Sequence, residues 1–522
     1  MQRYEILLMD ADDTLFDFHR AEREAIKNTL SAFGLEPTDE LTAVYSRINK
    51  ECWEQLERRE LDKKTLRYVR FERLCRELDF KADAKKMADF YVSDLATHAF
   101  LIDGAKELCR ELSEHFDIYI ITNGIKPVQE GRMMRSGIAP YIKKSFISED
   151  IGYEKPAREY FEAVAASIPN FSRERALVIG DSLTSDIKGG RDFGLDTCHY
   201  DPRGVNAKGM TYTVRNYDEL RAILYLPIYE EKLAQSGIKY AENIELSEHS
   251  SFKIGGLADL GVFPENAEDI KNAVRFAREC KIKYTVIGNG SNVLFSDRGY
   301  RGAVIFTSGA KNIEINENII KVDCGASFTY LAIAAGKASL SGLEFAYGIP
   351  GTVGGAVYMN AGAYGGEVKD ILTSSLCYDA ARDEIYEIEA HDFGYRTSIY
   401  AKNSDLTVLG ATFKLAHGDL DEIKSKMDEL MAKRRDKQPL EYPSAGSTFK
   451  RPEGCFAGKL IEDAGLKGYT VGGAQVSEKH AGFVINRGGA TAKDITILVD
   501  HIKKTVFSQF GVMLECEIKF VD

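Results

Sequence analysis

Short apolar runs alternate with helical patterns in the first part of the chain. Ile6 to Met9, Ile118 to Ile121 and Leu177 to Ile179 are apolar, and each run is followed by a polar or glycine-rich turn. This pattern is typical of buried parallel strands. Helical patterns lie between the runs, at 105–114 and 159–167. We therefore predict an α/β fold, a doubly wound parallel sheet whose functional side chains follow the carboxyl ends of the strands.

Two changes in the pattern predict the domain organisation. At about 16–100 the chain is rich in Glu, Lys, Arg, Leu and Ala at helical spacing with almost no β-branched runs, which predicts an inserted helical cap. Near Pro227 a charged helical segment gives way to a sequence richer in glycine and short strands. We predict one domain at 1–226 and a different one at 227–522.

Length, charge and cysteine usage narrow the class of protein. The chain has 522 residues, more than one hydrophobic core usually supports. Its formal net charge of −12 disfavours a surface that neutralises a phosphate backbone, so we expect no nucleic-acid partner. Nine cysteines are scattered without a CxxC pair, which indicates reduced thiols. No apolar run is long enough for a membrane span or a signal segment, so we predict a cytoplasmic protein without a membrane partner. The sequence leaves the oligomeric state open.

Carboxylates follow two of the predicted strands. DADDT places Asp10 and Asp12 after the first run, and GDSLTSD places Asp181 and Asp186 after the third. In a strand-end turn, the spacing of the first pair presents one carboxylate to a substrate and leaves the other for proton transfer. Carboxylates that converge at one sheet edge repel each other unless a hard cation lies between them. The sequence therefore predicts a Mg²⁺ site.

Two further elements suit phosphoryl oxygens. The first is Thr122 with Asn123 in IITNG, which supplies a hydroxyl donor. The second is Lys155 in GYEKP, which supplies a cation. The ordered series DxDxT, strand then Thr, Lys-Pro and GDxxxxD resembles the haloacid dehalogenase (HAD) superfamily over about residues 1–226.

This resemblance implies a mechanism. Asp10 attacks phosphorus to form an aspartyl-phosphate, while Asp12 protonates the leaving oxygen and later activates water. Mg²⁺ is held by Asp10, the Asp12 backbone carbonyl and Asp181, with Asp186 in support. DADDTLFDF, the cap length and GDSLTSDIKGG are most similar to the pyrimidine 5′-nucleotidase group, which implies a nucleoside monophosphate as the phosphomonoester substrate. The alternative is a catalytically silent nucleotide-sensing module, against which the intact Asp10 and Asp12 argue.

Two glycine-rich blocks occur in the second half of the chain. GNGSN follows a β-rich run in TVIGNGSNVLFSD, and GLEFAYGIPGTVGGAVYMNAGAYGGE comes about fifty residues later. Small residues let backbone amides approach a pyrophosphate, so two such loops favour an extended ligand such as FAD. No glycine triplet opens a helix after the strand at Val286, which disfavours a Rossmann unit. The candidate cofactor-binding residues are Gly288, Asn289, Gly290, Ser291, Asn292, Gly351, Thr352, Gly354 and Gly355.

Four more motifs accompany the glycine-rich blocks. They are FKIGG at 252–256, YRTS at 395–398, PSAGSTFK at 443–450 and LECEIKF at 514–520. Together these motifs resemble the UDP-N-acetylenolpyruvoylglucosamine reductase (MurB) family over about residues 228–522. The resemblance implies an α+β region: a vanillyl-oxidase-type FAD-binding fold at about 227–430 and a substrate-binding part at about 431–522.

The same resemblance implies the reaction. NADPH reduces FAD, and the reduced flavin gives hydride to the vinyl carbon of UDP-N-acetylglucosamine enolpyruvate, which becomes UDP-N-acetylmuramate. Arg396 binds and polarises the enolpyruvyl carboxylate, Glu517 stabilises the intermediate and Ser447 delivers the proton. Lys450 is a candidate for the substrate's pyrophosphate, whereas Arg451 stands where relatives commonly have Asn.

Two points stay open at this stage. The segment between Arg396 and Ser447 is short, like the form of the family that lacks an additional tyrosine-bearing loop, so substrate contacts from that loop are not carried over. A sugar oxidase on the same FAD fold is the alternative function, and YRTS, GSTFK and Glu517 argue against it.

Overall fold

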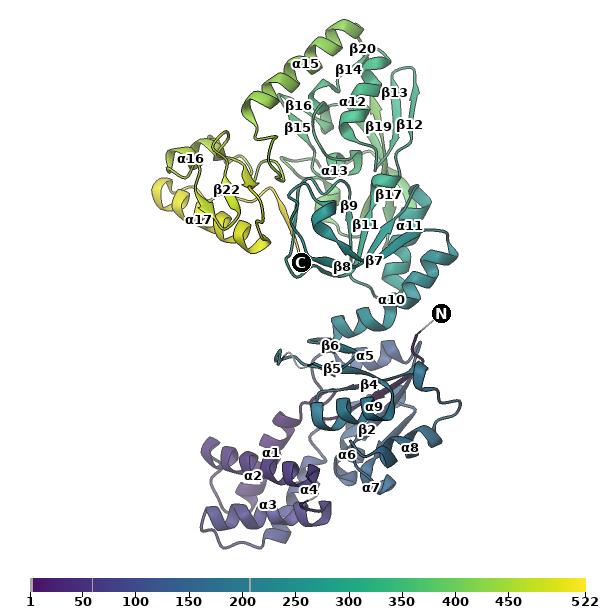
Figure 1. Ribbon diagram of the computed structural model, residues 1–522, viewed down its shortest axis with the longest axis vertical. Coiled ribbons are helices and arrows are strands. Elements are labelled where there is room, and N and C mark those ends of the chain that lie inside the picture. The colour runs from purple at the N-terminus through teal and green to yellow at the C-terminus, as the bar shows by residue number, and fades with distance from the viewer. Residues whose placement is uncertain (1–2, 59, 206–207) are drawn as a thin grey trace. The chain divides into compact units, whose positions relative to one another are not determined.

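The computed structural model describes residues 3–58, 60–205 and 208–522 (Figure 1). The chain divides into two compact units, Met1–Leu224 and Tyr225–Asp522, and each is described by itself. The helix at the division, α10 (Tyr217–Gln235), continues through Pro227. Among the described residues, no helix is both long and apolar enough to cross a membrane.

A six-stranded sheet forms the centre of the first unit. Its strand order is β3-β2-β1-β4-β5-β6, and each neighbouring pair runs parallel. The central strands β1 and β4 are buried along their whole length, which explains their unbroken apolar runs, because a parallel sheet is covered on both faces. The predicted α/β class is therefore confirmed. The strands are β1 (Ile6–Met9), β2 (Asp117–Thr122), β3 (Lys144–Ile147), β4 (Ala176–Gly180), β5 (Asp196–Tyr200) and β6 (Tyr212–Val214).

Helices alternate with these strands. Tyr160, Phe161 and Val164 of α8 pack with Phe193 of α9 against one face of the sheet, where they meet apolar side chains such as Leu8. The helices that follow the strands are α5 (Ala105–Leu112), α6 (Lys126–Ser136), α7 (Ser148–Ile151), α8 (Arg158–Ser167) and α9 (Lys188–Phe193).

In its described residues, the cap is a bundle of four helices between β1 and α5 (Figure 1). Tyr45, Phe71 and Tyr91 meet at its centre with ring centroids 5.2–5.4 Å apart. An Asp or Thr side chain accepts a backbone N–H at the start of each helix, which satisfies one of its free donors. The helices are α1 (Phe18–Ala32), α2 (Asp39–Glu57), α3 (Lys63–Glu77) and α4 (Ala84–Leu95).

The second unit is built on two larger sheets. In the four-stranded sheet β7-β8-β11-β9, β7 is antiparallel to β8 and the other pairs are parallel. The five-stranded sheet β12-β13-β19-β17-β18 is antiparallel throughout. These strands are β7 (Lys239–Glu245), β8 (Leu257–Phe263), β9 (Tyr284–Ile287), β11 (Tyr300–Phe306), β12 (Ile313–Asn316), β13 (Ile319–Asp323), β17 (Leu372–Asp379), β18 (Glu384–Ile388) and β19 (Leu406–Lys414). The helices among them are α11 (Ala267–Glu279), α12 (Phe328–Lys337), α13 (Val353–Tyr358), α14 (Ile399–Lys402) and α15 (Leu420–Lys437). Short two-stranded pairs are formed by β14 (Leu340–Ser341) with β20 (Ala416–His417) and by β15 (Gly362–Ala363) with β16 (Gly366–Glu367).

A smaller sheet and two helices complete this unit. Ile495, Leu498 and Ile502 of α17 pack against Ala474 and Val476 of the sheet. The combination of mixed sheets and helices confirms the predicted α+β class. The elements are α16 (Ala457–Asp463), β21 (Thr470–Val471), β22 (Ala474–Val476), β23 (Val484–Asn486) and α17 (Ala492–Phe510). The final strand, β24 (Lys519–Val521), pairs in parallel with β10 (Val293–Phe295), which follows the GNGSN turn.

Candidate active sites

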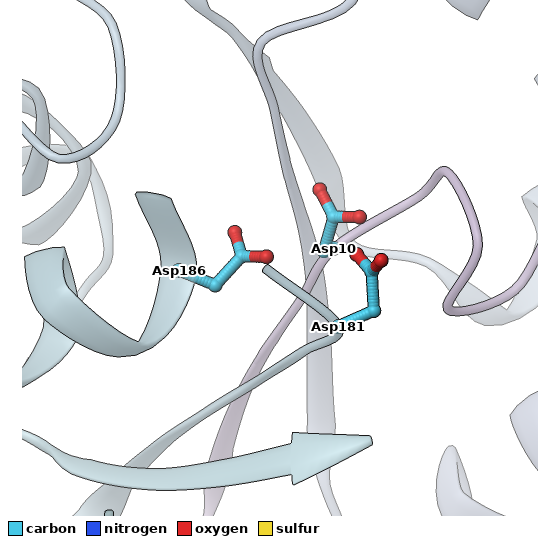
Figure 2. A group of neighbouring side chains, drawn as sticks. All are labelled: Asp10, Asp181 and Asp186. Atoms are coloured by element: carbon cyan, nitrogen blue, oxygen red, sulfur yellow. The ribbon is translucent and has the colours of Figure 1, made fainter. Parts of the chain in front are cut away.

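Three carboxylates meet at the carboxyl ends of β1 and β4. Asp10 follows β1, Asp181 follows β4, and Asp186 lies in the π-helical turn η3 (Leu183–Ile187). Figure 2 shows the three side chains turned toward one another, and each offers an oxygen within 4.8 Å of the others. Hard oxygen ligands grouped in this way suit Mg²⁺.

Lys155 brings a positive charge into this cluster. Its Nζ donates to Asp10 Oδ1 at 2.6 Å, to Asp186 Oδ1 at 2.5 Å and to the carbonyl of Ile121 at 2.8 Å. The lysine side chain is only 2 % exposed. A buried ammonium group needs such partners to offset its lost hydration. The lysine predicted to face phosphoryl oxygens therefore also joins two of the carboxylates.

Burial and like charge raise the pKa values of two carboxyl groups of the cluster, those of Asp10 and Asp181. Burial raises the pKa of Asp10 well above its ordinary value, against the attraction of Lys155. Burial, followed by repulsion from Asp186, raises the pKa of Asp181 to about 7. One buried cation for three carboxylates leaves an excess of negative charge that a divalent cation would neutralise. The donor set therefore fits the predicted Mg²⁺, for which Asp10 and Asp181 would be the side-chain ligands.

This electrostatic arrangement predicts a pH-dependent response to Mg²⁺. The pKa of Asp181 is raised in the folded chain, so the stability gained from its protonated form is present below its ordinary pKa and is lost as the pH rises through about 7. Mg²⁺ binds the ionised carboxylates. We therefore expect Mg²⁺ to raise the Tm of this unit more at about pH 8 than at about pH 5. Calorimetry at both pH values measures the shift, and Asp181→Asn is the control in which its pH dependence should shrink. Equal shifts at both pH values would contradict the prediction.

The TNG turn after β2 lies beside the same cluster. The buried Thr122 accepts a hydrogen bond on Oγ1 from the Gly124 N–H at 2.9 Å. The Asn123 carboxamide accepts from the Lys155 N–H at 2.8 Å and donates to the Lys155 carbonyl at 2.9 Å. This exchange fixes the backbone of Lys155 to the turn. The structure thus brings Thr122, Asn123 and Lys155 to the sheet edge that carries Asp10.

The Asp12 carboxylate is held by two residues that the motifs did not include. Gln129 Nε2 donates to Oδ2 at 2.7 Å, and Arg132 Nη1 donates to Oδ1. Both residues lie on α6, three positions apart, and therefore share one helix face. In the sequence they are ordinary polar positions three residues apart after the TNG turn, so no sequence signal singled them out.

The two glycine-rich blocks meet in the second unit. A Cβ on Gly288 would lie 2.2 Å from Thr352 Oγ1, and a Cβ on Gly290, where φ is +60°, would lie 2.1 Å from the carbonyl oxygen of His249. Neither position has room for a larger residue, and the second also requires a left-handed backbone. GNGSN leads into the strand β10 rather than a helix, as the sequence indicated.

Other predicted cofactor residues join the two blocks. Asn289 Nδ2 donates to the Pro350 carbonyl at 2.9 Å, and a Cβ on Gly351 would lie 3.5 Å from Ser291 Oγ. Thr352 caps α13 by accepting the Gly355 N–H. The Gly354 N–H donates to the Cys324 carbonyl at 2.7 Å. Hydrogen bonds therefore fix the second block to the GNGSN turn and to the backbone at Cys324.

A cavity of about 320 Å³ opens beside Gly288 and Asn289. Backbone amides and small side chains around a hollow of this kind suit the pyrophosphate of a dinucleotide such as FAD. Seven residues line the cavity besides Gly288 and Asn289, and only one of these seven, Lys253, lies in a quoted motif. They are Glu248, His249, Ser250, Ser251, Lys253, Phe306 and Ser308.

A second cavity, of about 380 Å³, is lined by Arg396, Ser447 and Glu517 together. Arg396 Nε lies 2.9 Å from Glu517 Oε1, and its Nη2 donates to the Gly362 carbonyl at 3.0 Å. The arginine has a φ of +57°, a backbone conformation that non-glycine residues adopt mainly where the surrounding structure imposes it. The Glu517 N–H donates to the Thr448 carbonyl at 2.9 Å, which places Glu517 beside the Ser447 segment.

Glu517 also contacts the GNGSN turn. Asn292 Nδ2, from the GNGSN turn, donates to the Glu517 carbonyl at 3.1 Å. Burial raises the pKa of the Glu517 carboxyl above its ordinary value, and the Arg396 guanidinium opposes that shift. The three predicted catalytic side chains thus lie next to a predicted cofactor loop.

Basic side chains gather around the second cavity. Lys450 is not among its lining residues, and its Nζ pairs with Glu515 at 3.2 Å. Arg451 does line it, with its guanidinium 3.9 Å from the ring centroid of Phe456. These cations suit an anionic substrate group such as a diphosphate. The lysines of the lining are Lys459, Lys467 and Lys479.

Comparisons with known proteins distinguish the two units. Residues 258–388 match the family model described as FAD binding domain, and residues 438–521 match that of the C-terminal domain of UDP-N-acetylenolpyruvoylglucosamine reductase. The reductase of Caldicellulosiruptor bescii is 48 % identical over 297 residues, which cover 56 % of this chain and 94 % of the relative. That of Clostridioides difficile is 50 % identical over 292 residues, which cover 55 % and 95 %. The chain belongs to the UDP-N-acetylenolpyruvoylglucosamine reductase family. The reductase structure from Thermus caldophilus is 34 % identical, covers 55 % of this chain and 100 % of its own, and has a TM-score of 0.47.

The first unit matches a different family. Residues 4–194 match the family model described as haloacid dehalogenase-like hydrolase. The structure of the HAD-hydrolase YfnB from Bacillus subtilis is 40 % identical, covers 42 % of this chain and 99 % of its own, and has a TM-score of 0.41. The predicted fusion of a HAD-like hydrolase with a member of the reductase family is confirmed.

Proposed function

We propose that the second unit reduces UDP-N-acetylglucosamine enolpyruvate to UDP-N-acetylmuramate with NADPH, in the synthesis of peptidoglycan precursors. The observation that carries this proposal is the convergence of Arg396, Ser447 and Glu517 on one cavity. Its basic rim supports a nucleotide-diphosphate substrate. FAD, when bound, would accept hydride from NADPH and deliver it to the vinyl carbon of the substrate.

The three polar residues have distinct parts in the proposed reaction. The Arg396 guanidinium binds the enolpyruvyl carboxylate, where negative charge grows as hydride arrives. Glu517, paired with Arg396 at 2.9 Å, orients the guanidinium and stabilises the intermediate. Ser447 gives its hydroxyl proton to the carbanionic carbon, a strong base, so a hydroxyl of ordinary acidity suffices when it is well placed.

The reductase proposal is tested by its dependence on substrate. The purified protein, loaded with FAD, should consume NADPH rapidly only when UDP-N-acetylglucosamine enolpyruvate is added. NADH at the same concentration tests the choice of nicotinamide. Oxygen-dependent oxidation of a free sugar, without NADPH, would instead establish an oxidase.

We further propose that the first unit is a Mg²⁺-dependent phosphatase that acts through an aspartyl-phosphate. The carboxylates of Asp10, Asp181 and Asp186 on one sheet edge, with the TNG turn and Lys155 beside them, support this mechanism. Asp10 attacks phosphorus and Asp12 protonates the leaving oxygen, then activates water. The motif resemblance to pyrimidine 5′-nucleotidases supports nucleoside monophosphates as substrates.

A panel of phosphomonoesters tests the substrate class. Phosphate release is measured with Mg²⁺ for nucleoside monophosphates, sugar phosphates and UDP-sugar fragments. Preference for pyrimidine monophosphates would support the nucleotidase proposal. Nucleotide binding without phosphate release from any member of the panel would favour the alternative of a catalytically silent sensing module.

A further inference from the structure

Arg132 is the most deeply buried cation near the first active site. Its side chain has no exposed surface, and the described residues provide it with one anionic partner, the Asp12 carboxylate. Its guanidinium carbon lies 4.5 Å from the ring centroid of Phe16 and 5.9 Å from that of Phe18, on the link into the cap. Nε and Nη2 have no hydrogen-bond partner among the described residues. A guanidinium surrounded in this way depends strongly on its one carboxylate.

Gln129 fixes the other oxygen of the same carboxylate. Its Nε2 donates to Asp12 Oδ2 at 2.7 Å, and its side chain is buried. The same carboxamide lies under the TNG turn, since a Cβ on Gly124 would come within 2.1 Å of Gln129 Nε2. Gln129 therefore ties the orientation of Asp12 to the turn that carries Thr122.

Both oxygens of Asp12 are thus held by one face of α6. Two hydrogen bonds to different oxygens fix the rotation of a carboxylate as well as its position. We infer that Gln129 and Arg132 are positioning residues that hold Asp12 for proton transfer to the leaving group. The inference rests on the proposed phosphatase function, because it concerns how well Asp12 performs its part of that reaction. Neither residue belongs to the motifs from which the site was predicted.

Proton transfer matters most when the leaving group is poor. A nitrophenolate leaves without much help from an acid, whereas an alkoxide needs a proton as the P–O bond breaks. A misplaced Asp12 should therefore slow hydrolysis of an alkyl phosphate much more than hydrolysis of a nitrophenyl phosphate. A general loss of structure would slow both reactions by a similar factor.

The test compares Arg132→Met with the wild-type full-length protein on benzyl phosphate and 4-nitrophenyl phosphate, with Mg²⁺. We expect kcat/KM for benzyl phosphate to fall at least about tenfold more than kcat/KM for 4-nitrophenyl phosphate, within the range that general acid catalysis provides. Arg132→Lys keeps the charge but not the planar fork, and should recover part of the selective loss. Gln129→Leu removes one contact to Asp12 and no charge, and it should likewise lower kcat/KM more for benzyl phosphate than for 4-nitrophenyl phosphate. This variant replaces Arg132→Met in the test if Arg132→Met does not fold.

A double-mutant cycle assigns the effect to Asp12. In the Asp12→Asn background, Arg132→Met should cause no further selective loss, because the acid it positions is already absent. If kcat/KM falls by the same factor for both esters in Arg132→Met, the inference is overturned and the phosphatase proposal stays intact. If Arg132→Met does not fold, the same result in Gln129→Leu overturns the inference. An undiminished selective loss in the Asp12→Asn background would also overturn it. No phosphate release from either ester by the wild-type protein would overturn the phosphatase proposal and this inference together.

Discussion

Asp10→Asn is expected to lower Mg²⁺-dependent phosphate release by at least about 10⁴-fold, because an amide cannot serve as the nucleophile. The fold should persist, since Asn has nearly the same shape and Lys155 keeps its bond to Asp186 at 2.5 Å. NADPH consumption by the second unit should be unchanged. Malachite-green detection of phosphate and the NADPH assay on one preparation measure both activities.

A matched control strengthens this experiment. Asp39→Asn makes the same chemical change at a carboxylate whose side chain is 93 % exposed in the cap, and both activities should stay at the wild-type level. Retention of phosphate release in Asp10→Asn would rule out the aspartyl-phosphate mechanism. A loss of reductase activity in the same variant would instead show that the two units are functionally coupled.

Ser447→Ala is expected to lower reductase turnover by about 10²- to 10⁴-fold, the contribution of a well-placed general acid. Reduction of bound FAD by NADPH should continue at the wild-type rate, since Ser447 acts only after hydride has reached the substrate. The backbone next to the serine is anchored, because the Thr448 N–H donates to the Gly482 carbonyl at 2.9 Å and Thr448 Oγ1 accepts the Val484 N–H at 3.0 Å.

Rapid-mixing absorbance measurements separate the two half-reactions. Flavin bleaching by NADPH reports the first, and flavin reoxidation on addition of UDP-N-acetylglucosamine enolpyruvate under anaerobic conditions reports the second. Ser444→Ala, three residues earlier and outside the cavity lining, should leave both phases unchanged. A slow first phase in Ser447→Ala would contradict the proposed role and point to damage at the flavin.

The sequence predicted those features of the sites that depend on neighbouring residues in the chain. Asp10 and Asp181 come directly after buried apolar strands, so parallel pairing of β1 with β4 is enough to bring them together. Gly288 and Gly290 were identifiable because close backbone approach excludes larger residues, and both indeed lack room for a Cβ. In each case the residues that indicate the role lie within a few positions of one another in the sequence.

The contacts that the sequence did not predict are long-range and made by ordinary helix residues. Gln129 and Arg132 reach Asp12 across 117 and 120 positions of sequence. In PVQEGRMMR they resemble any polar positions of a surface helix, and only the packing of α6 on the strand ends shows that they are buried. The sequence likewise predicted only part of the lining of the cavity beside the GNGSN turn, because most of the lining residues lie at 248–253, before β8.

The pairing of β10 with β24 has a consequence for how the protein is made. Asn292 exchanges hydrogen bonds with Glu517 and Lys519, and the first of these contacts spans 225 positions. A ribosome releases the GNGSN turn long before it has synthesised its partner strand, while the first unit, which comes earlier, can already fold. Flavin capture is therefore expected to wait until Glu517 and β24 have been synthesised. A nascent chain stalled before Glu517 should contain a folded first unit and a GNGSN turn that does not yet bind flavin.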